Sequence, residues 1–277
     1  MKRLKYIKFT KKTVSLLILT ILALMAFIPL YWMVVTAFKE PSLTMKFPPE
    51  IIPADPTLQN FESLFQRSEL FRWTLNSVIV AGTVTITQIF FCAMAGYSIA
   101  KKRFPGGKIL LWVYISSMMI PKQVTIVPLY IMVANFNMIN TYPGLILPSI
   151  AAPFGVFLMR QFMLSLPGEI IDSARIDGAG EFKIFWSIIL PMSKPALAVL
   201  GIFTFVREWN SFLWPLIVTQ TTEMKTLQAG LALIQEEVPM EYAYLMAGAT
   251  YAAIPMIIVF LSFQKYFLRG VTVGSIK

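Results

Sequence analysis

The stretch from residue 169 to residue 195, EIIDSARIDGAGEFKIFWSIILPMSKP, is the longest charged interruption in the apolar C-terminal part of the chain. It begins with Glu169 and Asp172, acidic residues that favour the positively polarised N-terminal end of a short helix. Gly178 and Gly180 then predict a helix end, because glycine adopts left-handed backbone angles without steric cost. Apolar residues at helical spacing predict a second, amphipathic helix: Phe182, Phe185, Trp186 and Ile189. The pattern predicts two short helices on a membrane face, and a solvated connector between membrane spans fits it equally.

The composition around this stretch is that of a membrane protein. Of 277 residues, 57% are hydrophobic, and the mean hydropathy of +0.68 is too high for an ordinary soluble domain. The net charge of +10 comes from Lys and Arg at the ends of apolar runs, which is typical of membrane topology rather than of nucleic-acid binding. The chain has a single cysteine, Cys92, which excludes a disulfide framework. It has no histidine, which argues against a metal site, so we expect no bound metal.

Uncharged runs predict an all-α, polytopic membrane protein with six transmembrane helices. The run 14–38 is longer than the apolar core of a signal peptide and long enough to span a bilayer. The run 109–159 carries one charge, Lys122, and fits two passes with a turn at 135–144. The expected segments are a basic N-terminus at 1–13, a first span at 14–38, an external loop at 39–72, a core at 73–267 and a tail at 268–277. Within the core we expect spans at 73–100, 196–218 and 242–264, a loop at 160–195 and external residues at 219–241.

The distribution of basic residues predicts the orientation of these spans. Lys and Arg number 17 on the side of both termini and of the loop 160–195, and 5 on the opposite side. Short cytoplasmic segments carry the excess of Lys and Arg in membrane proteins. We therefore expect both termini and the loop 160–195 in the cytoplasm, and the loop 39–72 outside it.

Three segments carry a resemblance to a known family. Asp172-Ser173-Ala174, three residues, Gly178, nine residues, Ile188, one residue and Leu190-Pro191 resemble the E-A-A-x3-G-x9-I-x-L-P loop of permease subunits of bacterial ABC importers. Asp172 replaces the usual glutamate and Ser173 the first alanine, which preserves charge and small size. The segments 201–216, GIFTFVREWNSFLWPL, and 264–274, QKYFLRGVTVG, resemble the carbohydrate-type permeases, in particular the smaller permease of the maltose transporter.

This resemblance implies a type I ABC importer permease fold, a location in the bacterial cytoplasmic membrane, and transport of sugars or oligosaccharides. The implied partners are membrane lipid, a second homologous permease, two ABC ATPase subunits and an extracytoplasmic sugar-binding protein, with no nucleic acid. The sequence contains no G-x-x-x-x-G-K-[ST] loop, so we expect no enzyme activity and no bound cofactor, and ATP hydrolysis by the partner subunits.

The resemblance also implies that the loop 160–195 couples the permease to the ATPase through its short helices. The implied coupling residues are Glu169, Asp172, Ser173, Ala174, Asp177, Gly178, Gly180, Leu190 and Pro191. Asp172 would accept hydrogen bonds from the ATPase, Ala174 would keep the docking face small, and Gly178 would allow a sharp turn. The aromatic residues of the second helix would seat it against the body of the permease.

Ionisable and aromatic residues inside the predicted spans are candidates for the substrate path. Lys122 either lines a hydrated path or sits at the interface, because the helix can end near Pro121. Arg207 and Glu208 are adjacent and point about 100° apart on a helix, so pairing between them is not expected and each needs a partner or water. Glu208, Trp209 and Asn210 offer the polar groups and flat apolar surface that sugars need, while an interfacial girdle or contact with the partner permease explains the same residues.

Other functional classes remain as alternatives. A secondary transporter would show internal repeats and intramembrane carboxylates, whereas Glu208 is the only acid within a predicted span and no convincing repeat is present. A membrane-embedded enzyme would need clustered catalytic groups within the bilayer, and none is visible in the sequence. An ABC permease for another polar solute fits the same loop motif.

Overall fold

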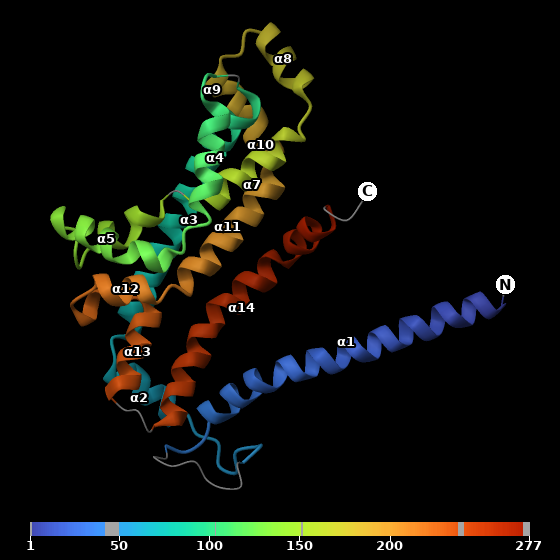
Figure 1. The fold of residues 1–277 in the computed structure, drawn as a ribbon. Helices are drawn as coiled ribbons and strands as arrows, with labels where there is room; N and C mark the ends of the chain where they lie inside the picture. The colour runs from blue at the N-terminus through green and yellow to red at the C-terminus, as the bar shows by residue number, and fades with distance from the viewer. Residues whose placement is uncertain (1, 42–49, 103, 151, 238–240, 274–277) are drawn as a thin grey trace. The chain divides into compact units, whose positions relative to one another are not determined.

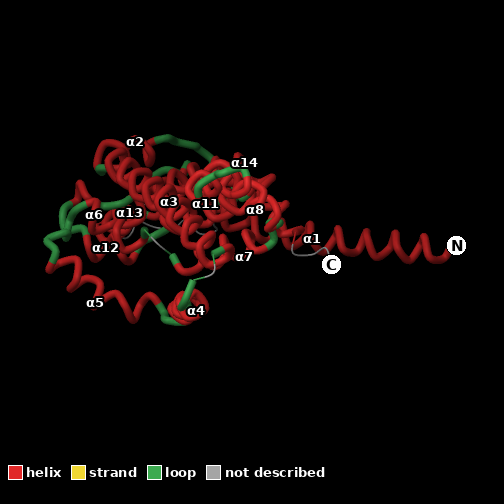
Figure 2. The backbone as a smooth tube through the Cα atoms, turned by 90° about the horizontal axis from the view of Figure 1, so that it is seen from above, coloured by secondary structure: helices red, strands yellow, loops and turns green. Residues whose placement is uncertain are grey.

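The computed structural model describes residues 2–41, 50–102, 104–150, 152–237 and 241–273. These residues form helices and connecting loops, without a strand among them (Figure 2). The chain divides into two compact units, Met1–Ser68 with Leu231–Ile254 and Glu69–Gly230 with Pro255–Lys277. Helices α13 (Leu227–Glu237) and α14 (Tyr242–Val273) contribute residues to both units.

The first unit is built on α1 (Lys2–Ala37) and α2 (Gln59–Arg67). From Val14 to Leu30 the large apolar side chains of α1 are exposed, as expected for a helix surrounded by lipid or a partner. Asn60 of α2 is buried, and its Nδ2 donates hydrogen bonds to the carbonyls of Ala37 at 2.9 Å and Lys39 at 2.6 Å. The predicted loop 39–72 therefore contains a helix that is anchored to the end of α1, while residues 42–49 of that loop lie outside the described residues.

The second unit contains the remaining helices (Figure 1). They are α3 (Leu70–Lys101), α4 (Gly107–Ser117), α5 (Lys122–Asn135), α6 (Tyr142–Ile146), η1 (Leu147–Ser149), α7 (Pro153–Leu164), α8 (Gly168–Ile176), α9 (Glu181–Ile184), the π-helix η2 (Phe185–Ile189), α10 (Leu190–Met192), α11 (Lys194–Trp209), α12 (Leu213–Val218) and η3 (Thr222–Met224).

Small residues let three of these helices pack closely. A Cβ added to Gly96 on α3 would lie 2.7 Å from the Cβ of Met159 on α7, and one added to Gly155 on α7 would lie 2.7 Å from the sulfur of Cys92 on α3. Small residues permit such close approach of helices in membranes. Leu200 of α11 is buried in the same cluster as Cys92, so α3, α7 and α11 form one packed block.

Three of the six predicted spans are single helices, and six spans are reached if each of three bent helix pairs counts as one span, the last of which begins within the predicted loop 160–195. Among the described residues, Lys12–Ala37, Leu70–Lys101 and Tyr242–Gln264 are each long and apolar enough to cross a membrane. Three helix pairs pass the same test but are bent at a break: Gly107–Ser117 with Lys122–Asn135 by 102°, Tyr142–Ser149 with Pro153–Leu164 by 43°, and Glu181–Met192 with Lys194–Trp209 by 77°. The sharpest bend carries α4 and α5 out to one side of α3 and α11 (Figure 2).

The predicted fifth span, 196–218, is not one helix. α11 ends at Trp209 and α12 begins at Leu213. The side chain of Asn210 donates to the carbonyl of Val206 at 2.8 Å, and Pro215 lacks the N–H that would continue the helical ladder. The residues predicted as an external segment, 219–241, include η3 and all of α13.

Candidate functional site

α8 ends in a left-handed turn at Gly178, whose φ is +76°. The Gly178 amide donates to the carbonyl of Arg175 at 3.0 Å, and the Ala179 amide donates to that of Ala174 at 2.9 Å. These two bonds form a Schellman motif, in which glycine takes the left-handed position at no steric cost. The turn predicted at Gly178 is confirmed, and Gly180 continues from it in extended conformation into α9.

An ionic cluster connects α8 with the end of α3. Arg175 on α8 lies 3.1 Å from a carboxylate oxygen of Asp172 and 3.1 Å from one of Glu181. Glu181 also contacts the ammonium of Lys102 and accepts a hydrogen bond of 3.2 Å from the hydroxyl of Tyr97. The hydrogen bond from Lys102 is the main cause that lowers the pKa of Glu181 below its ordinary value. One carboxylate thus joins α8, α9 and α3.

A second contact fixes the connection between α7 and α8. The ammonium of Lys101, the last residue of α3, donates to the carbonyl of Leu166 at 2.6 Å. α8 lies at one end of the block formed by α3, α7 and α11, whereas α12 lies toward the opposite end (Figure 1). Lys101 and Lys102 therefore contact the residues on either end of α8, Leu166 before it and Glu181 after it.

The two faces of α8 differ in exposure. Ile171 and Ala174 are buried against the α3/α7/α11 block. The predicted coupling residues on the outer side are exposed: Glu169, Asp172, Ser173, Asp177, Gly178 and Gly180. Ile176 is 86% exposed. Ala174 was expected on the docking face, and its burial corrects this, because the apolar face of α8 covers the core and the outer face carries acids and Ile176.

The second predicted helix is irregular. It consists of α9 followed by a π-helix, which has a wider turn than an α-helix. The wider turn buries Phe185, which packs 5.5 Å from the ring of Tyr97. Trp186, predicted to seat this helix, is about half exposed and packs edge-on against Phe90 of α3 with ring centroids 6.2 Å apart. Phe182, predicted to do the same, is instead exposed and stacks on Trp186 with centroids 6.3 Å apart. Of the two remaining coupling candidates, Leu190 is half-buried against the core and Pro191 is exposed.

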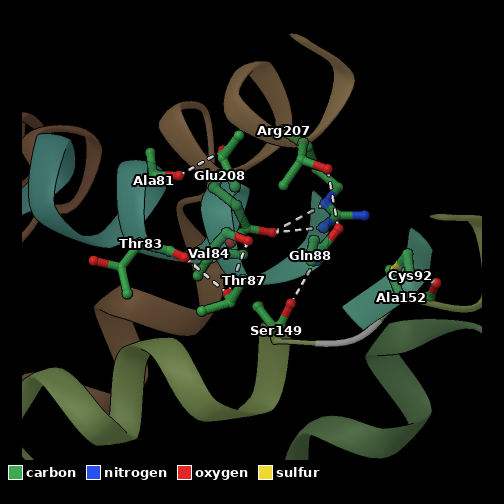
Figure 3. A network of polar contacts seen from close by, with 12 residues as sticks. Ala81, Thr83, Val84, Thr87, Gln88, Cys92, Ser149, Ala152, Arg207 and Glu208 are labelled. Carbon is green, nitrogen blue, oxygen red and sulfur yellow. Dashed lines mark hydrogen bonds and ion pairs between the residues drawn. The ribbon is translucent and has the colours of Figure 1, made fainter. Parts of the chain in front are cut away.

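A second polar site lies on α11 and includes the candidate substrate-path residue Glu208 (Figure 3). Arg207 and Glu208 form an ion pair with Nη2 and Oε1 2.9 Å apart. This corrects the expectation that adjacent helix residues would need separate partners, because a long arginine side chain can fold back to its neighbour. One turn earlier, Thr204 donates to the buried amide of Gln88 at 3.0 Å, and Gln88 donates to the carbonyl of Ser149.

Lys122 opens α5 directly after the 102° bend. The preceding helix α4 does end shortly before Pro121, at Ser117, and whether Lys122 lines a hydrated path or sits at the interface stays a prediction. The ammonium of Lys122 nevertheless lies within electrostatic reach of Arg207 and Glu208. The structure thus brings three charged residues of two broken spans to one region.

The other two candidates occupy different environments. Trp209 is 1% exposed and stacks on Phe205 with centroids 5.9 Å apart. Asn210 is exposed and caps the end of α11. Contact of a sugar with either residue stays a prediction.

Comparison with known proteins decides the family. Residues 88–273 match the family described as binding-protein-dependent transport system inner membrane component. The chain belongs to this family. The matched region includes α8, the ionic cluster and the Arg207–Glu208 pair. This family and the relatives below are transport permeases that depend on a binding protein, so the alternative of a secondary transporter is dropped.

Individual relatives cover nearly the whole permease. It is 37% identical over 257 residues to the arabinooligosaccharides transport system permease protein AraQ of Bacillus subtilis (strain 168), with 92% of each chain covered. It is 34% identical over 255 residues to the sn-glycerol-3-phosphate transport system permease protein UgpE of Yersinia pestis, with 89% of this chain and 91% of the relative covered.

A solved structure has the same fold. It is the crystal structure of a bacterial ABC transporter involved in the import of the acidic polysaccharide alginate. The match has a TM-score of 0.82 at 20% identity and covers 92% of the permease and 95% of that chain. Together with the family, it confirms the predicted all-α importer permease fold.

Sequence reasoning missed the residues that hold α8 in place. Glu181, Arg175 and Tyr97 were assigned no role in the permease, and the basic pair Lys101-Lys102 was used only to orient the spans. The signal that could have found them is the isolated acid directly after the glycine turn, which lies near the basic end of a span once the helices fold back.

Proposed function

We propose that this permease forms half of the translocation path of an ATP-driven importer for sugars or oligosaccharides. Its proposed partners are a second homologous permease, two ABC ATPase subunits and an extracytoplasmic sugar-binding protein, and ATP is hydrolysed on the partner subunits. The name of the arabinooligosaccharide relative, similar over 92% of the chain, supports the substrate class. The excess of Lys and Arg supports cytoplasmic termini and a cytoplasmic α8 in a bacterial membrane.

The observation that supports the coupling role is the way α8 is packed against the α3/α7/α11 block and bonded to the end of α3. Its outer face presents acids and the exposed Ile176, while its inner face is packed and tied by Arg175 and Glu181 to the end of α3. An ATPase that binds the outer face would move α8 as a rigid lever. The ionic cluster and the contact of Lys101 would transmit that movement to α3.

A pull-down of the tagged permease from its native host in mild detergent tests this role. Because Ile176 is 86% exposed, Ile176→Asp should leave the fold intact and weaken ATPase binding. Ile51→Asp is the matched control, since Ile51 is 68% exposed in the predicted extracytoplasmic loop. We expect the ATPase to be lost only with Ile176→Asp, with the second permease retained in both. Equal ATPase recovery from the two variants would contradict docking on α8.

The substrate class needs a separate test, because one relative is named for sn-glycerol-3-phosphate. Uptake of labelled arabinooligosaccharides and of labelled sn-glycerol-3-phosphate is compared in cells with and without the permease gene. Permease-dependent uptake of the saccharide supports the proposal. Permease-dependent uptake of sn-glycerol-3-phosphate alone would instead assign the permease to another polar solute.

A further inference from the structure

The Arg207–Glu208 pair joins no two helices, because both residues lie on α11. The Glu208 side chain is 7% exposed and that of Arg207 is 37% exposed. Burying an ion pair costs desolvation free energy that the attraction between the charges often does not offset. A pair that links no helices has no cross-linking role to compensate this cost. What it does achieve is to hold one guanidinium in a fixed orientation within a predicted span.

This orientation leaves one edge of the Arg207 guanidinium available to bind a ligand. Nε and Nη2 of Arg207 lie 3.0 Å and 2.9 Å from the same oxygen of Glu208, and the two groups face each other in Figure 3. These nitrogens form one edge of the planar group. The terminal edge, with one N–H from each of Nη1 and Nη2, donates to no residue in the part of the chain that the structure describes. Such a fork matches the two oxygens of a carboxylate or a phosphate.

The surroundings favour an anion and water. Lys122 and the pair lie on two broken spans, on α5 and α11. Backbone breaks lie next to both, at 118–121 before Lys122 and at 210–212 after Arg207. Irregular backbone at membrane depth is tolerated where it is buried in protein or lines a water-filled cavity. The exposure of Arg207 beside such a break is what a hydrated path would produce.

We propose that the terminal edge of Arg207 binds an oxyanion of the transported sugar, either a carboxylate or a phosphate ester. Glu208 is a positioning residue, because it orients the guanidinium without contacting the substrate. The proposal rests on the proposed function, since it takes the transported solute to be a sugar.

Thermal stabilisation of the complete detergent-purified importer tests the site with four probes: glucuronate, glucose 6-phosphate, inorganic phosphate and glucose. We expect the first two to bind more tightly than the last two. Arg207→Gln should raise the apparent Kd for glucuronate roughly tenfold to hundredfold, as for loss of a hydrogen bond to a charged group. Arg207→Lys should restore part of the affinity, because it keeps the charge but not the fork. Arg72→Gln, the same charge change at an exposed position of α3, is the matched control and should change nothing.

Glu208→Gln separates positioning from a structural role. It should reduce the preference for glucuronate over glucose while the complex stays assembled. Equal binding of glucose and glucuronate, an unchanged Kd in Arg207→Gln, or no stabilisation by any probe would overturn the proposal. Inorganic phosphate binding as tightly as glucose 6-phosphate would also overturn it, because the site would then take a free anion. None of these results would change the outcome of the ATPase pull-down or of the uptake test. Failure of the oxyanion site at Arg207 is therefore distinguishable from failure of the proposed function.

Discussion

Replacing Gly178 by alanine should loosen the turn after α8 through the backbone alone. The φ of +76° lies in the left-handed region, and an added Cβ would meet no atom within 4 Å. The cost is therefore that of a left-handed conformation for an L-residue, about 1–2 kcal/mol. A change of this size raises the population of the opened turn roughly 5- to 30-fold. The two hydrogen bonds of the Schellman motif should break in the opened state.

Hydrogen exchange of the purified permease, measured by mass spectrometry on peptides covering residues 174–180, detects this opening. Gly180→Ala is the matched control, because Gly180 has a φ of −67° and also has open space around an added Cβ. Gly178→Asn should exchange more slowly than Gly178→Ala, since asparagine tolerates the left-handed region. Exchange that rises equally in Gly178→Ala and Gly180→Ala, or in neither, would refute the argument from backbone conformation.

Three further predictions concern the α3/α7/α11 block and its attachments. Gly96→Ala should sharply lower the thermal stability of the detergent-solubilised permease, because the added Cβ would lie 2.7 Å from a side chain of α7. Gly82→Ala is the control and should be neutral or stabilising, because no atom lies within 4 Å of its added Cβ. Because the pKa of Glu181 is lowered, its carboxylate is ionised and makes all its contacts at neutral pH, and these contacts are lost as the pH falls through that pKa. A spin label on α8 at Ser173→Cys should therefore become more mobile in acid. The same label should already be mobile at pH 7 in Glu181→Gln. Asn76→Ala removes the amide that donates to the carbonyls of Glu223 at 2.7 Å and Lys225 at 2.8 Å, just before α13. It should lower the free energy of unfolding in chemical denaturant by about 1–3 kcal/mol. An unchanged midpoint of the denaturation curve would show that water replaces the amide.

The features that the sequence predicts well are those set by one residue or by composition. The turn at Gly178 follows from the freedom of glycine, and the six spans follow from uncharged runs. The break at 118–121 was open as an alternative because of Pro121, but the break at 210–212 could not be placed, because hydropathy measures the length of an apolar run and not the continuity of its hydrogen bonds. The burial of Ala174 and the ion pair of Arg207 depend on which way a helix face turns in the folded protein, and that is settled by packing against distant segments.

α3 links the two candidate sites of the permease. Its final residues hold α8, and its middle carries Gln88, which binds α11 through Thr204 one turn before the Arg207–Glu208 pair. The close contacts of Gly96 and Gly155 leave no room for α3 to slide along α7. A displacement of α8 must therefore move the whole block of α3, α7 and α11 as one body. The breaks in α4/α5 and α11/α12 are the places where the backbone can absorb the change, so we expect docking on α8 to alter the spacing of Lys122 and Arg207 rather than the packing of the block.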